Sequence, residues 1–117
     1  MINNAESLKD FIIKLLEEKQ ADNIMSLDVR YETDLTKYMI FASGRSTKNV
    51  SAIAEYIDIE LKHNYSLPTT IEGISTGQWV LLDAGEVILN LFYPTSRSDL
   101  KIEEMWEKRK KNKANYT

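Results

Sequence analysis

Residues 77–93, GQWVLLDAGEVILNLFY, carry two apolar runs separated by Ala84 and Gly85. Two strands joined by so short a turn pair as an antiparallel hairpin. If Ala84 and Gly85 are the two turn residues, Asp83 faces Glu86 and the register is fixed outward from that pair. One face of the hairpin is then purely aliphatic and is predicted to lie against helices: Val80, Leu82, Val87, Leu89 and Leu91.

The opposite face of this hairpin mixes apolar with polar side chains. In the same register Leu81 faces Ile88, and Trp79 faces Asn90. An aromatic and aliphatic patch rimmed by carboxylates is typical of a protein contact more than of a substrate pocket. The alternative is that the last helix of the chain simply covers Trp79. The candidate partner-binding residues are Trp79, Leu81, Asp83, Glu86, Ile88, Asn90 and Phe92.

Three further segments repeat apolar residues at helical spacing, so helices are predicted over residues 5–19, 47–63 and 98–108. Strands are also predicted at 24–30 and 37–43, with a short one at 69–73, and the first two are close enough to form a second antiparallel hairpin. The order αββαβββα predicts an α/β (α+β) domain with a mixed sheet and flanking helices. The last predicted helix takes its apolar side from Leu100, Ile102, Met105 and Trp106.

Composition limits the class of protein. The chain has 117 residues, enough for one domain, with 43% hydrophobic and 28% charged residues, which is ordinary globular usage. It has no cysteine and one histidine, so thiol chemistry, disulfides and thiolate metal sites are excluded. No apolar run is long enough to span a membrane and the N-terminus does not resemble a signal or transit peptide, so we expect a cytoplasmic protein.

The charge is unevenly distributed along the chain. Residues 107–117 carry five basic residues against one acidic residue, a net charge of +4. Because the whole chain carries −3, residues 1–106 carry −7. We therefore expect one acidic domain over 1–106, suited to a basic protein partner, and a basic tail over 107–117. That tail is predicted to be disordered; a contact with RNA is the alternative.

The segment around Gly44 has two interpretations. A strand, Gly44, and then Ser46 and Thr47 opening a helix would direct backbone N–H groups at a phosphate. The fuller phosphate-binding motifs are absent, since Gly44 stands alone. The competing interpretation, which the sequence favours, is that Ser46 caps the helix and Gly44 makes the turn.

No catalytic or metal-binding constellation is visible in the sequence. Metal-dependent nucleotidyl transfer needs clustered carboxylates, but strand alternation places Asp28 beside Arg30, which predicts an ion pair instead. His63 lies near the end of a predicted helix, where it is typical of a surface histidine. We therefore expect no catalytic residue, no metal and no cofactor.

Three blocks of sequence together resemble the ribosomal silencing factor family, also called the Iojap family. They are LDVRYETDLTKYMIFASGRSTKNV (27–50), EGISTGQWVLLDAGEVILNLFYP (72–94), and Arg97 followed by IEEMW (102–106). The resemblance covers residues 5–106. It implies a nucleotidyltransferase-like fold without the catalytic carboxylates, which agrees with the lack of a visible catalytic constellation.

The resemblance also implies a function. Members of this family bind the large ribosomal subunit at its protein number fourteen, block joining of the small subunit and so repress translation; mitochondrial and plastid members act in large-subunit assembly. The family's tryptophan corresponds to Trp79 and its hairpin acids to Asp83 and Glu86. Asn90 stands where many members carry histidine, and Leu100 where many carry tyrosine.

Other functions stay open beside this one. An assembly factor of the large subunit would use the same surface. A nucleotide-binding enzyme using the Gly44 loop is a remote alternative from another class. An rRNA contact by the basic tail and a homodimer off the ribosome are further associations that the sequence does not decide.

Overall fold

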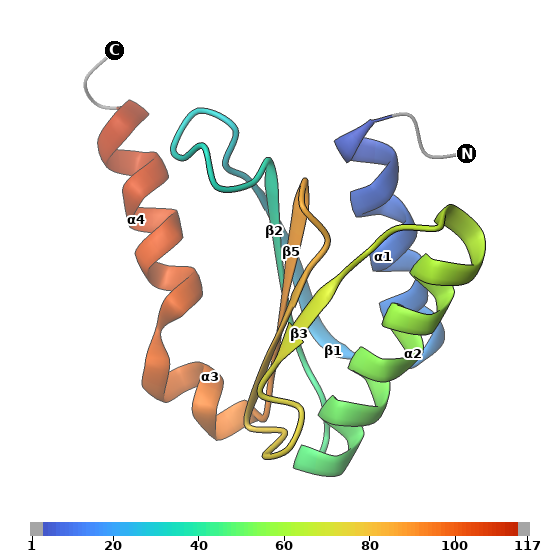
Figure 1. Ribbon diagram of the computed structural model, residues 1–117. Helices are drawn as coiled ribbons and strands as arrows, with labels where there is room; N and C mark the ends of the chain where they lie inside the picture. Colours follow the sequence, from blue (N-terminus) through green and yellow to red (C-terminus); the bar gives the residue numbers. More distant parts are fainter. Residues whose placement is uncertain (1–3, 115–117) are drawn as a thin grey trace.

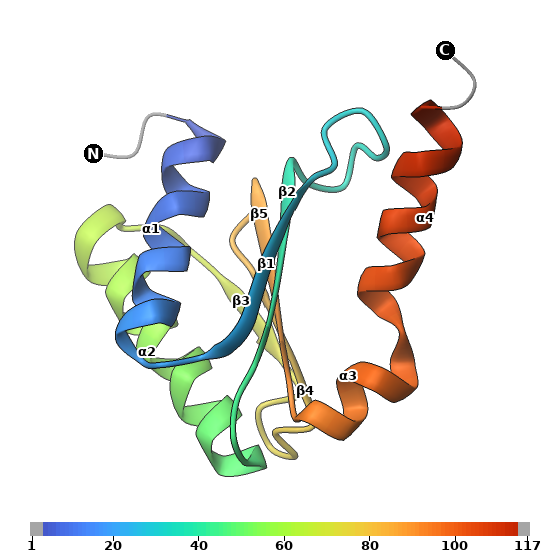
Figure 2. The same ribbon diagram turned by 180° about the vertical axis from the view of Figure 1, so that it is seen from behind.

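The computed structural model describes residues 4–114 and contains one five-stranded sheet between two layers of helices (Figures 1 and 2). Seven of the eight predicted elements lie where the sequence places them, within a few residues. The elements are α1 (Ala5–Glu18), β1 (Asp22–Asp28), β2 (Tyr38–Ser43), α2 (Thr47–Tyr65), β3 (Thr70–Glu72), β4 (Trp79–Asp83), β5 (Val87–Phe92), α3 (Pro94–Leu100) and α4 (Ile102–Ala114).

The sheet has the strand order β1-β2-β5-β4-β3, and it confirms the predicted mixed architecture. β1 and β2 form one antiparallel hairpin, β4 and β5 another, and β3 pairs with β4. The two hairpins meet through β2 and β5, which run parallel at the centre. Every residue of these two strands is buried, as expected for strands covered on both faces.

The first face of the sheet is covered by α1 and α2 (Figure 1). Both helices direct an apolar stripe at it, with Leu8, Ile12 and Leu16 from α1 and Ile53 and Ile57 from α2. The aliphatic hairpin face predicted from the sequence lies against them and is fully buried: Val80, Leu82, Val87, Leu89 and Leu91.

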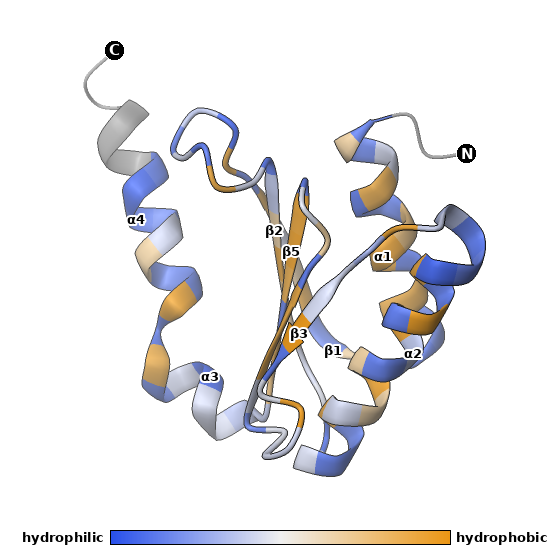
Figure 3. Ribbon diagram, viewed as in Figure 1, coloured by the Kyte–Doolittle hydropathy of each residue, from blue (hydrophilic) through white to orange (hydrophobic). Residues whose placement is uncertain are grey.

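The second face of the sheet is covered by α4, and much more sparsely. α4 is largely hydrophilic (Figure 3), and among its described side chains Trp106 and Ile102 supply the apolar contact. They pack on a cluster from β1, β2, β5 and the residue after β1 that includes Val29, Phe41 and Phe92. The helix is therefore attached to the sheet by a narrow apolar contact.

The closing helix differs from the prediction of one helix over 98–108. Pro94 starts α3, Lys101 adopts a left-handed conformation at φ 54°, and α4 starts at Ile102. This break turns Trp106 toward the sheet and leaves Leu100 and Met105 about half exposed. α4 then continues to Ala114, so residues 107–114 of the basic segment, predicted to be disordered, are helical here.

The register of the β4–β5 hairpin also differs from the prediction. Asp83 pairs with Ile88 and Trp79 with Phe92, a shift of two residues. Glu86 N–H donates to the Ala84 carbonyl, which makes Gly85, at φ 82°, the centre of the turn. Because a shift of two preserves alternation, the predicted assignment of residues to the two faces remains correct.

The start of α2 yields a stability prediction. Ser46 Oγ accepts a hydrogen bond of 3.0 Å from Asn49 N–H, as the cap interpretation requires. We expect Ser46→Ala to lower the free energy of unfolding by about 1 kcal/mol, because one N–H of the first turn loses its acceptor. Urea denaturation measures this, with Ser66→Ala at the other end of α2 as the comparison, because there the backbone N–H makes the capping bonds and alanine retains it. A loss in Ser46→Ala below about 0.3 kcal/mol would contradict the cap.

Candidate protein-binding surface

The second face of the sheet is only partly covered, because α4 packs on β1, β2 and β5 and leaves β4 and β3 open on that side. Trp79, Leu81 and Asp83 point to this open part and are half-buried, and Glu86 follows at the exposed hairpin end. We call these four residues the docking surface. They form an apolar strip that ends in two carboxylates.

Trp79 is held in place by two contacts with β5. Its ring stacks on Phe92, with 5.9 Å between the ring centroids and 15° between the planes. Its indole Nε1 donates a 3.0 Å hydrogen bond to Asn90 Oδ1. Because stacking and the hydrogen bond together fix the ring, binding of a partner would cost little side-chain entropy at Trp79.

The other three candidate residues lie beneath the surface. Ile88, Asn90 and Phe92 are 4%, 3% and 1% exposed. The structure therefore places all seven predicted residues on one side of the sheet, but four of them are accessible to a partner and three are buried. Trp79, Leu81, Asp83 and Glu86 are accessible, while Asn90 and Phe92 support Trp79 from below.

Two further residues lie on this face that the sequence does not reveal. Thr70 and Glu72 of β3 pair with Asp83 and Leu81, which places them beside the docking surface, and both are exposed. A three-residue strand carries too little periodicity to indicate which side it presents. Glu72 adds a further acidic group to the rim.

The acids at the hairpin end also stabilise the hairpin itself. Asp83 Oδ1 accepts a 2.8 Å hydrogen bond from Gly85 N–H, and Glu86 forms a 3.2 Å ion pair with Lys37. The Glu86 carbonyl accepts from the backbone N–H groups of Lys37 and Tyr38. The hairpin end is thus joined to the loop between β1 and β2.

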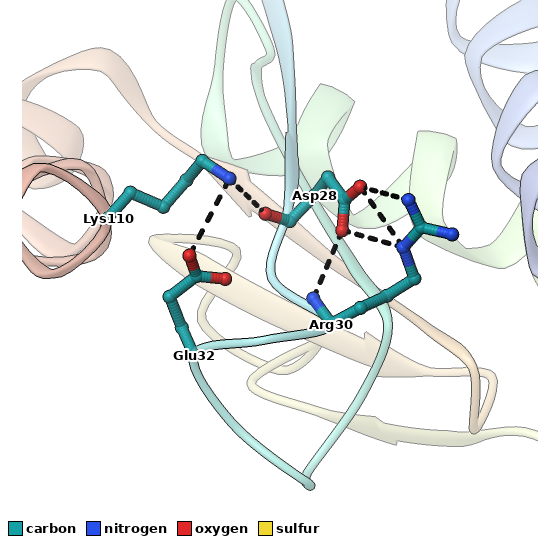
Figure 4. Close-up of polar contacts among 4 residues, drawn as sticks. All are labelled: Asp28, Arg30, Glu32 and Lys110. Atoms are coloured by element: carbon teal, nitrogen blue, oxygen red, sulfur yellow. Dashed lines mark hydrogen bonds and ion pairs between the residues drawn. The ribbon is translucent and has the colours of Figure 1, made fainter. Parts of the chain in front are cut away.

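Polar contacts fix α4 at both ends of its described part. Near its start, Arg97 pairs with Glu103 and donates to Ser43 Oγ at 2.9 Å. Near the other end, Lys110 donates to the Asp28 carbonyl at 2.6 Å and lies 3.7 Å from Glu32 (Figure 4). These contacts hold α4 over β1, β2 and β5, next to the docking surface on β4.

The predicted pair of Asp28 and Arg30 is confirmed. Arg30 Nε lies 2.9 Å from Asp28 Oδ1, and side-chain hydrogen bonding from Arg30 is the main reason that the pKa of the Asp28 carboxyl lies below its ordinary value (Figure 4). Asp28 therefore stays ionised and paired with Arg30 near neutral pH.

Three N–H groups around the Gly44 turn already have acceptors within the protein, including Gly44 N–H, which donates to the Phe92 carbonyl at 3.0 Å. Ser46 Oγ accepts from Asn49 N–H, and Asn49 Oδ1 accepts from Arg45 N–H at 3.0 Å. The side chains of Ser46 and Asn49 therefore cap the start of α2, as the cap interpretation requires. His63 is exposed in the last turn of α2, as predicted.

The described part of the chain shows neither a metal-binding cluster nor a membrane-spanning helix. Within residues 4–114, no group of three His, Cys, Asp or Glu side chains is arranged to hold a metal ion. None of the helices described there is both long and apolar enough to cross a membrane.

Comparison with known families identifies the chain. The family model described as "Ribosomal silencing factor during starvation" matches residues 2–116. The chain belongs to this family. The sequence resemblance is thereby confirmed, and the match extends on both sides of residues 5–106.

Named relatives agree with this assignment. The ribosomal silencing factor RsfS of Zymomonas mobilis is 36% identical over 101 residues, covering 86% of this chain and 76% of the relative. That of Bacillus subtilis is 29% identical over 103 residues, covering 88% and 87%. The mouse protein "Mitochondrial assembly of ribosomal large subunit protein 1" is 28% identical over 100 residues, covering 83% of this chain and 44% of the mouse protein.

Two solved structures resemble the fold of this chain. A protein from Chromobacterium violaceum superposes with a TM-score of 0.85 at 31% identity, covering 89% of this chain and 87% of that protein. One from Bacillus halodurans gives a TM-score of 0.76 at 22% identity, covering 86% and 94%. The second likeness concerns the fold alone.

Membership in the family gives two departures a structural meaning. Asn90, at the position where the resemblance places histidine in many ribosomal silencing factors, accepts the Trp79 hydrogen bond below the surface. Its amide oxygen serves as the acceptor there. Leu100, at the position where the resemblance places tyrosine in many members, is 44% exposed at the end of α3.

Proposed function

We propose that this protein binds the large ribosomal subunit through its protein number fourteen, blocks joining of the small subunit, and so represses translation in the cytoplasm. Membership in the ribosomal silencing factor family supports this. The observation that carries it in the structure is Trp79, a partly accessible aromatic side chain that Phe92 and Asn90 hold in place on the docking surface.

The proposed mechanism is steric and involves no catalysis. Trp79 and Leu81 supply the apolar anchor, with Asn90 and Phe92 supporting Trp79 and buried Ile88 beside Asp83 in the next strand. Asp83 and Glu86 sit on an acidic body and attract a basic ribosomal surface. A folded domain bound to the intersubunit side of the large subunit prevents docking of the small subunit by its volume.

A second candidate function is assistance in large-subunit assembly. The name of the mouse relative assigns assembly of the ribosomal large subunit to that protein. An assembly factor would use the same docking surface on an immature particle. The two functions therefore differ in the particle bound and in the effect on joining.

The deciding experiment is sedimentation of the purified protein with separated ribosomal subunits, followed by a subunit-joining assay. We expect co-migration with the mature large subunit and fewer joined ribosomes as the protein is added. Binding only to immature large particles, without an effect on joining, would favour the assembly function. Binding to neither particle would contradict both, and nucleotide binding would then be the next assay.

A further inference from the structure

The loop between β1 and β2 lies at the same end of the sheet as the β4–β5 turn (Figure 1). Two of its large apolar side chains are exposed to solvent. Tyr31 is 75% exposed and Leu35 is 65% exposed. Neither side chain belongs to the core, and the one aromatic contact of Tyr31 described here is with Arg30, whose guanidinium carbon lies 5.8 Å from the centre of its ring. Such a patch on an ordered loop indicates an interaction site.

The loop is held rigidly by bonds at both of its ends. Val29 N–H donates to the Lys37 carbonyl at 2.9 Å, which closes its base. Thr36, which is 5% exposed, donates from Oγ1 to the Gly85 carbonyl at 3.0 Å and ties the loop to the hairpin end. Lys110 of α4 ties the other side through Asp28 and Glu32 (Figure 4). The exposed side chains are thus presented on a preorganised frame.

A pocket of about 350 Å³ lies between this loop and the β4–β5 turn. Its apolar wall comes from Tyr31 and Leu35, and its far wall includes Glu86, which also belongs to the docking surface. The pocket therefore continues the docking surface past the hairpin end. A partner bound along β4 could therefore contact this pocket through the same interface.

The charges around the pocket favour a cation. Arg30 is neutralised by Asp28, and Lys37 forms an ion pair with Glu86. Asp34, which also lines the pocket, is exposed and forms no ion pair with the side chains described for residues 4–110. One carboxylate is left uncompensated beside an apolar wall, within a domain of net charge −7 over residues 1–106.

We propose that this pocket receives a lysine or arginine side chain of the ribosomal partner that docks on Trp79. Such a side chain matches the lining, because its aliphatic stem packs on Leu35 and Tyr31 while its charged end reaches Asp34. The proposal rests on the proposed function and extends its contact from β4 to the β1–β2 loop. It makes Leu35 and Asp34 determinants of affinity for the large subunit.

The test measures the dissociation constant of the full chain for purified large subunits at several salt concentrations. Leu35→Ser removes the apolar wall and should weaken binding about tenfold. Asp34→Asn removes the charge while keeping the shape and should weaken binding about threefold at low salt, with a smaller difference at high salt. Ile59→Ser is the matched control, since Ile59 is 54% exposed on α2, over the opposite face of the sheet, and should leave binding unchanged.

The outcomes separate this inference from the proposed function. If Trp79→Ala weakens binding and both loop variants bind like the wild type, the pocket is not part of the interface. If Leu35→Ser weakens binding and Asp34→Asn has no effect at any salt concentration, the occupant is not a basic side chain. Failure of the wild type to bind would overturn the proposed function and this inference with it.

Discussion

Phe92→Ala should lower the free energy of unfolding by about 3 to 5 kcal/mol, the usual cost of removing a fully buried phenylalanine. Phe92 is 1% exposed at the end of a central strand and carries the stacked ring of Trp79 on its own ring. It also belongs to the cluster on which Trp106 of α4 packs. Its loss would leave a cavity where α4 has little other apolar contact, so the helix should loosen as well.

Urea denaturation followed by tryptophan fluorescence measures this effect, because Trp79 and Trp106 both report on the cavity. Ile59→Ala is the control: its side chain is 54% exposed on α2, so the change should be within about 0.5 kcal/mol. If Phe92→Ala cost less than about 1 kcal/mol, the ring would not be enclosed between Trp79 and α4 in solution. If such a stable variant still lost binding to the ribosome, the loss would come from the interface and not from unfolding.

The core of this fold is predictable from the sequence because its signals are periodic. The stripes on α1 and α2 and the alternation along residues 79–92 each show which side is buried, without reference to the rest of the chain. The sequence predicts the two faces of the β4–β5 hairpin correctly but not its register. The face on which a side chain lies depends only on whether its position in the strand is odd or even, whereas the pairing of residues across the hairpin depends on the turn.

The errors lie where a single backbone conformation decides the outcome. Ala84-Gly85 and Gly85-Glu86 are both acceptable two-residue turns, and the second is favoured here by the Asp83 carboxylate bonding to Gly85 N–H and by Lys37 holding Glu86. The break at Lys101 has no local signal, because lysine itself does not favour a left-handed conformation. Arg97 pairing with Glu103 across that break is a tertiary contact.

The sequence predicts on which side of the sheet the candidate residues lie, but it does not predict which of them are buried. Sequence alternation places Trp79, Asn90 and Phe92 on one side of the sheet, which is correct. It cannot show that α4 lies over half of that side, since the position of a helix on a sheet depends on contacts such as Lys110 with the Asp28 carbonyl. The division into accessible and supporting residues is therefore a property of the packed structure.

Trp79→Ala should weaken binding to the large ribosomal subunit by about 2 kcal/mol or more, which is roughly 30-fold in the dissociation constant. The indole is the largest accessible apolar group on the docking surface, and its stacking on Phe92 and hydrogen bond to Asn90 mean that it is already ordered before the partner arrives. The measurement is the dissociation constant for purified large subunits, with subunit joining as the second readout.

Trp79→Phe separates the contribution of Trp79 to partner binding from its contribution to the stability of the fold. It retains an aromatic ring over Phe92 but removes the donor to Asn90, which is 3% exposed and loses its partner. We expect this variant to lose some stability through Asn90 and to keep more affinity than Trp79→Ala, because most of the apolar contact area remains. If Trp79→Ala is folded and binds as tightly as the wild type, the tryptophan is not the anchor. The partner would then have to be held by the acidic rim and the loop alone, where affinity should fall steeply with added salt.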